Sequence, residues 1–92
     1  MVGVPARRPR PSRIVRDENV LGGEPTVAGT RVPVRSIVIG LGRYGGDVAR
    51  VAQAYRLDVE AVRDAQAYYR AHRQEIDAFI RDNELAAESA DE

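Results

Sequence analysis

A glycine-rich stretch in the middle of the chain has the spacing of a dinucleotide-binding loop. Gly40, Gly42 and Gly45 form a G-x-G-x-x-G pattern, in which backbone N–H groups can approach a pyrophosphate. Such a loop follows a buried strand, and a second strand ending in an acid follows about 20 residues later. Asp58 has roughly that offset, but it opens a helical pattern. We therefore favour a glycine-rich connection between two helices over nucleotide binding, and expect no cofactor.

The acids and the single histidine do not combine into a catalytic or metal-binding set. Asp58, Glu60 and Asp64 fit the start of a helix, where carboxylates interact favourably with free backbone N–H groups. His72 is flanked closely by arginines and lacks well-spaced partner donors for a metal. The chain has no cysteine, which excludes disulfides, thiolate metal sites and a cysteine nucleophile. We expect no catalytic residue and no metal ligand, and therefore no enzyme.

The basic residues are all arginines and are unevenly distributed along the chain. Residues 1–56 hold ten arginines against four acids, whereas residues 57–92 hold four arginines against ten acids. The net charge of zero therefore hides two halves of opposite sign. Such a division suggests that the two ends meet different partners.

The hydrophobic pattern predicts a short β-hairpin followed by three or four helices. Residues 13–16 form a candidate strand, and a tight hairpin is expected where Thr26–Val27 and Thr30–Val32 flank a turn at Gly29. Pro33 suits the first turn of a helix. The apolar stripe of that helix follows at helical spacing and consists of Val34, Ile37, Val38 and Leu41.

Two further helices are predicted by capping residues and by the continuing apolar pattern. Asp47 caps a helix over 47–55, and Asp58 caps another that begins after a break at residues 56–57. The pattern then continues through Ile80, either as one bent helix or as a fourth helix that restarts near His72.

Length and composition predict one small domain between two charged tails. The 92 residues fit one domain, which we place at 13–81, after a disordered basic arm at 1–12 and before a flexible acidic tail at 82–92. No apolar run approaches the ~18 residues of a membrane span, and the N-terminus lacks the apolar core of a secretory signal. We expect a cytoplasmic protein with no membrane contact.

The tight connection between the helices at 47–55 and 58–71 is typical of a helix-turn-helix. Arginines in or near it could contact DNA phosphates, as could the basic arm. Against this, the acids at the start of the later helix would repel phosphates, so a helical hairpin that does not touch DNA is an open alternative. The candidate DNA-binding residues are Arg7, Arg8, Arg10, Arg43, Arg50, Arg56 and Arg63.

The run Gly23-Glu24-Pro25-Thr26-Val27-Ala28-Gly29-Thr30-Arg31-Val32-Pro33-Val34 resembles the signature of the family named domain of unknown function 433, a G-x-P-x-I-x-G-T-R-I-P-V pattern. The resemblance extends over roughly residues 13–82, with Leu21 where a cysteine is common. It implies a mainly α fold, with a small N-terminal hairpin and a three- or four-helix bundle containing a helix-turn-helix of winged-helix or homeodomain-like type.

The same resemblance implies a VapB-type antitoxin of a type II toxin–antitoxin pair, which silences a PIN-like ribonuclease toxin and represses its own operon, as a homodimer. Since the active site of such a toxin is a cluster of carboxylates, an arginine should cap it. We expect either residues 7–16 or a later helix to do so, while the acidic tail docks on a basic surface of the toxin. The candidate toxin-binding residues are Arg70, Arg73, Arg81, Glu84 and Glu88. The alternative is a stand-alone DNA-binding module or a dimeric interaction domain without a toxin.

Overall fold

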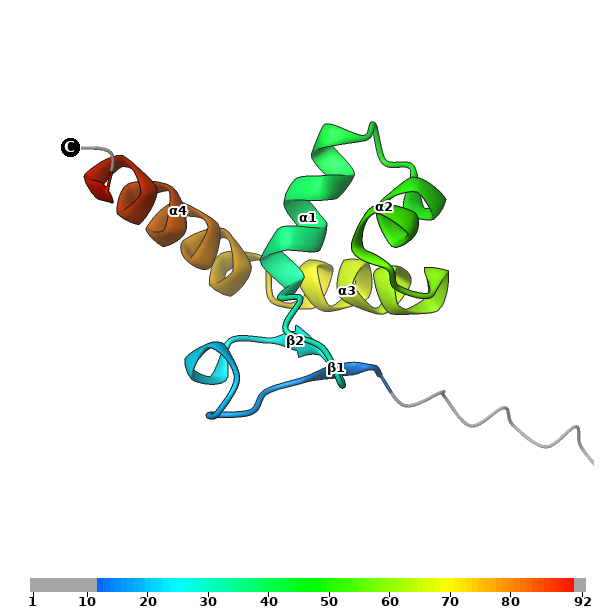
Figure 1. Ribbon diagram of the computed structural model, residues 1–92, viewed down its shortest axis with the longest axis horizontal. Coiled ribbons are helices and arrows are strands. Elements are labelled where there is room, and N and C mark those ends of the chain that lie inside the picture. The colour runs from blue at the N-terminus through cyan, green and yellow to red at the C-terminus, as the bar shows by residue number, and fades with distance from the viewer. Residues whose placement is uncertain (1–11, 91–92) are drawn as a thin grey trace, which may run out of the picture.

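A computed structural model describes residues 12–90, with side chains described as far as residue 86. A two-stranded antiparallel sheet of β1 (Ile14–Val15) and β2 (Thr26–Val27) is followed by four helices (Figure 1). These are α1 (Val34–Arg43), α2 (Val48–Tyr55), α3 (Val59–Ala71) and α4 (Arg73–Ala90), and a short 3₁₀ turn, η1 (Leu21–Gly23), lies between the strands. The predicted mainly α fold with a small N-terminal hairpin is confirmed. No helix within residues 12–90 is long and apolar enough to cross a membrane.

The predicted hairpin pairs differently from the expected one. β2 pairs with β1, with Ile14 opposite Val27 and Val15 opposite Thr26, whereas residues 30–32 do not form a strand. The turn itself is present, with Gly29 at φ 77° and the Val27 N–H donating to the Val32 carbonyl at 3.0 Å. Pro33 limits the return to a single bridge opposite Thr26, because proline has no N–H to extend a ladder.

The first helix and the glycine-rich stretch occupy one continuous segment. Pro33 stands at the N-cap, and α1 runs from Val34 to Arg43, so a helix and not a strand precedes the glycines. Gly40 lies inside this helix, where an added Cβ would come within 3.0 Å of the Tyr55 ring. Gly45 and Gly46 have positive φ and turn the chain into α2. The glycines therefore permit close packing and a tight turn, and the strand–loop–helix context of a dinucleotide site is missing.

The remaining helices begin where the capping residues predict. The Asp47 carboxylate accepts the Arg50 N–H at 3.0 Å and caps α2. Arg56, in the left-handed region at φ 56°, turns the chain from α2 toward α3. His72 ends α3, and a separate α4 follows. This helix continues to Ala90, through most of the predicted acidic tail, because alanine, glutamate and leucine are good helix formers.

The core lies where α1, α2, α3 and the first turns of α4 meet under β2. Its fully buried side chains come from every helix and from the second strand: Val27, Val34, Ile37, Val51, Ala52, Ala61, Val62, Ala65 and Ile76. Among the described side chains of α4, those of the first part contribute to the core, and every one from Arg81 to Ala86 is exposed. Figure 1 shows the rest of α4 projecting away from the bundle.

Candidate partner-binding surfaces

The residue that precedes β1 is an arginine that contacts the acidic start of α3. The Arg13 guanidinium donates to the Asp58 carboxylate at 2.7 Å, and the Arg13 backbone N–H donates to Asp64 at 2.9 Å. Asp58 therefore occupies the predicted N-cap position without making a side-chain cap bond. The third acid of the group, Glu60, lies 3.9 Å from Arg63. The acids that would repel DNA phosphates thus have cationic neighbours or backbone donors.

A second arginine of the N-terminal segment ties it to the junction of α3 and α4. The Arg16 guanidinium donates to both Glu75 carboxylate oxygens, at 2.5 and 2.6 Å, and to the Tyr68 hydroxyl. The Tyr68 hydroxyl donates in turn to Glu75 at 3.0 Å. The hydrogen bonds from Arg16 hold the pKa of Glu75 below its ordinary value, and burial raises the pKa of Tyr68. The network leaves the Glu75 charge satisfied inside the fold.

A third pair, largely buried, joins the signature loop to α1. Arg35 Nε lies 2.8 Å from Glu24 Oε2, and the two side chains are only 19% and 8% exposed. These two atoms attract as opposite charges but lack the angle of a hydrogen bond. The acid of the Gly-Glu-Pro sequence is therefore a structural partner of α1, which anchors the loop that carries the hairpin.

The predicted DNA-binding arginines that the structure describes are distributed over three helices and the turn between two of them. Arg43 ends α1 and Arg50 lies in the first turn of α2, where its guanidinium carbon is 5.1 Å from the centre of the Tyr44 ring. Arg56 lies beyond the other end of α2, and Arg63 lies on the exposed side of α3. The remaining predictions fall outside the described residues: Arg7, Arg8 and Arg10.

Two of the predicted toxin-binding residues line one groove. This groove has a volume of about 350 Å³ and lies between α1, the end of α3 and the start of α4. We call it the arginine groove; its lining residues are Val38, Leu41, Gly42, Gln66, Tyr69, Arg70 and Arg73. Its walls are aliphatic and aromatic, the side chains of Arg70 and Arg73 line it, and none of its described lining residues is an acid. This mixture of aromatic and arginine side chains is typical of the centres of protein interfaces.

Local contacts hold the side chains of the arginine groove in position. The Tyr69 hydroxyl donates to Asp77 at 2.8 Å, and this hydrogen bond raises the pKa of Tyr69. The guanidinium carbon of Arg73 lies 5.3 Å from the centre of the Tyr69 ring, within cation–π range. Fixed side chains lose less freedom on binding, so Tyr69 and Arg73 would lose little conformational entropy when a ligand enters the groove.

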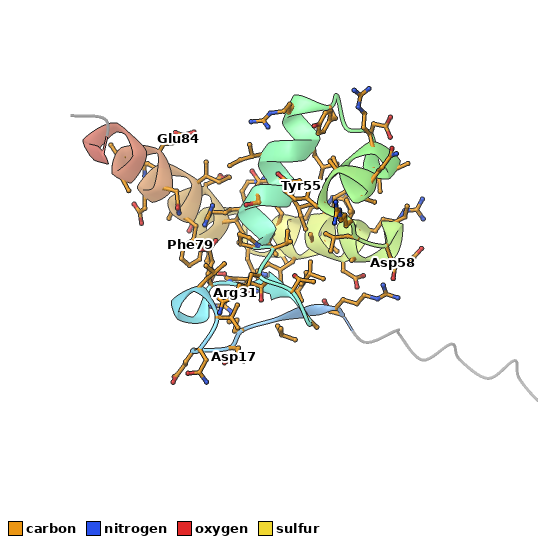
Figure 2. All side chains as sticks on the ribbon, in the orientation of Figure 1. Asp17, Arg31, Tyr55, Asp58, Phe79 and Glu84 are labelled. Atoms are coloured by element: carbon orange, nitrogen blue, oxygen red, sulfur yellow. The ribbon has the colours of Figure 1, made fainter. Side chains whose placement is uncertain are left out.

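The other predicted toxin-binding residues lie apart from the groove. Arg81 and Glu84 are exposed on the projecting part of α4, and the Glu88 side chain is outside the described residues. Figure 2 shows Glu84 on the projecting helix, on the opposite side of the bundle from Asp58. Val38 and Leu41 of the groove were predicted only as part of the apolar stripe of the first helix. No spacing along the chain indicates the groove, because its walls come from three helices.

A second hollow, of about 400 Å³, opens beside the hairpin turn. Its lining includes Gly29, Thr30 and Arg31 of the signature run together with Asp17. Arg31 is exposed and forms no ion pair with the described acids, and Figure 2 shows it on the hairpin side of the molecule. Because a carboxylate and a guanidinium both line this hollow, its charge is nearly balanced, and it selects neither sign of ligand.

Comparison with known proteins places most of this structure in one family. No curated protein and no solved structure matches the chain. Within residues 12–90, no group of three or more histidine, cysteine or acidic residues could hold a metal ion. A family match covers residues 14–69, from β1 to near the end of α3, which is more than half of the chain. The chain belongs to the family described as "Protein of unknown function (DUF433)".

Proposed function

We propose that the chain is a non-catalytic antitoxin that binds and neutralises a PIN-like ribonuclease through the arginine groove. The observation that carries this proposal is the groove itself. It brings Arg70 and Arg73 together beside the Tyr69 ring, and no acid is among its described lining residues. Paired guanidinium groups bind carboxylates in two-pronged geometry, and a ribonuclease with a carboxylate cluster offers that ligand.

A role in repressing its own promoter is the second part of the proposal. The helix-turn-helix formed by α2 and α3 keeps Arg56 and Arg63 exposed, and Arg13 offsets the charge of Asp58. Arginines in these positions can contact phosphates and orient the motif on a duplex. This part is tested by gel shifts on the DNA upstream of the gene at rising salt, since specific binding persists where purely phosphate contact fades steeply.

The toxin-binding part of the proposal is tested by co-expressing this chain with the protein encoded by the reading frame next to its own gene. We expect the two chains to co-purify, and the partner's cleavage of single-stranded RNA to fall to background when this chain is added at equal molar amounts. A partner that cleaves RNA equally fast with a molar excess of this chain would overturn the proposal. Specific binding to upstream DNA without any inhibition would instead favour a stand-alone DNA-binding module.

A further inference from the structure

The projecting part of α4 is a charged helix with no surface of its own to pack against. All side chains from Arg81 to Ala86 are exposed, and Leu85, at 55%, has a larger exposed fraction than Val15, Leu21 or Ile39, the other exposed large apolar residues described. From residue 82 onward the sequence holds five acids and no base. An exposed leucine among acids gains nothing from packing in the isolated chain. It is well suited to bind an apolar groove with cationic walls.

The arginine groove has the complementary chemistry, on the same chain. Val38, Leu41 and Tyr69 offer apolar surface, and Arg70 and Arg73 supply the opposite charge. The two surfaces cannot meet within one molecule. α4 begins at the groove with Arg73 and runs away from it as one helix, so Glu84 lies about 16 Å along the axis from Arg73 at 1.5 Å per residue.

We infer that two copies of this chain form a dimer in which the projecting part of α4 of each copy lies in the arginine groove of the other. Each chain carries one groove and one acidic helix end, so a two-fold arrangement satisfies both at once. Leu85 supplies the apolar contact, and Asp82 and Glu84 face Arg70 and Arg73. A chain of 92 residues has a thin core, and such a contact stabilises it by mass action.

A second copy fits these observations better than an unrelated acidic protein, because charge and apolar surface match within a single sequence. The inference stands independently of the proposed function, although it concerns the same groove. An acidic partner would have to displace the neighbouring α4 to reach Arg70 and Arg73, so the two contacts compete for one groove. If the unchanged chain is monomeric, the groove is open to a partner and the antitoxin proposal stands. If no partner binds, the dimer is still tested on this chain alone.

The experiment is sedimentation equilibrium on the full chain without any partner protein, using variants with reversed charges. The reversed-groove variant is Arg70→Glu/Arg73→Glu, and the reversed-helix variant is Asp82→Arg/Glu84→Arg. All four positions are exposed, so circular dichroism should show both variants folded. We expect the unchanged chain to dimerise and each variant alone to be monomeric. An equimolar mixture should form a heterodimer, since both contacts then join opposite charges again.

A substitution of the apolar anchor provides an independent measurement with a matched control. Leu85→Asp should weaken dimerisation about 30-fold or more, because the variant loses the burial of a leucine side chain in the interface. Leu21→Asp changes a leucine of 40% exposure at the hairpin side and should leave the dissociation constant unchanged. The inference is overturned if the unchanged chain is monomeric up to ~100 µM, well above micromolar affinities. It is overturned equally if both leucine variants dimerise alike or if the mixed variants do not associate.

Discussion

The N-terminal strand and the projecting part of α4 both carry dense charge, but the fold treats them in opposite ways. Arg13 and Arg16 of the strand segment are paired with Asp58 and Glu75. The residues from Arg81 to Ala86 make no ion pair within the described chain and bury no side chain. Some of the opposite charges of the two halves therefore pair with each other and stabilise the fold. The charged side chains on the projecting part of α4 and in the arginine groove are available to partners.

The largest expected effect is on the free energy of unfolding, and it distinguishes the buried first turns of α4 from its exposed, projecting part. Ile76 is fully buried, so Ile76→Ala should lower the free energy of unfolding by about 2–5 kcal/mol through lost contacts and a cavity. Arg81→Ala, one and a half turns further on and exposed, should change it by less than about 0.5 kcal/mol. Urea denaturation of both variants measures this. Equal losses would show that the projecting part of α4 packs as firmly as its start.

The buried pair between the signature loop and α1 should come next in size. Arg35→Met leaves the Glu24 carboxylate buried without a cation, which should cost about 3 kcal/mol. The double variant Arg35→Met/Glu24→Gln should recover most of that loss, because no buried charge remains. Arg43→Met, at an exposed arginine of the same helix, is the control. Thermal melts in which Arg35→Met behaves like Arg43→Met would contradict the account.

The smallest effect concerns the contact between Arg16 and Glu75. Their side chains are 48% and 32% exposed, so solvent weakens the attraction and Glu75→Gln should cost about 1 kcal/mol or less. The folded chain holds the pKa of Glu75 below its ordinary value of 4.5, so protonation favours the unfolded chain. The stabilisation is thus complete above about pH 4.5 and is lost as the pH falls through the lowered pKa.

This last prediction is checked by urea denaturation across pH 3–7, a range that covers the titration of ordinary carboxyl groups. The difference between the unchanged chain and Glu75→Gln should be constant at neutral pH and shrink in acid. A difference that grows as the pH falls would have the wrong sign for a carboxyl group with a lowered pKa.

Much of this fold follows from local signals in the sequence. The apolar stripe from Val34 to Leu41 and the Asp47 cap each depend on neighbours within a few residues, and both are confirmed. Of the two alternatives left open near His72, the structure shows the separate fourth helix. The pairing of β1 with β2 was not predicted. β1 is also held against α3 by the hydrogen bond from the Arg13 N–H to Asp64, 51 residues further along the chain, and local patterns carry no information about such distant contacts.

The candidate site was predictable only in pieces. Arg70 and Arg73 were selected for their charge, but the groove that joins them to Leu41 and Tyr69 exists only once α1, α3 and α4 are packed. The family match ends at Tyr69, so Arg73 and the rest of α4 lie beyond it. The sequence alone also suggested that the acids of α3 would repel DNA phosphates. The fold shows that Arg13, 45 residues earlier in the chain, contacts Asp58.

The most direct test of the arginine groove measures the affinity between this chain and the product of the adjacent reading frame by isothermal titration. Arg70→Glu/Arg73→Glu should weaken that affinity by about 100-fold or more, because reversed charges would repel a carboxylate cluster. The control, Arg43→Glu/Arg56→Glu, reverses two exposed arginines that do not line the groove and should leave the affinity within about threefold. Equal affinities for both double variants would contradict the central claim that the arginine groove is the partner-binding surface.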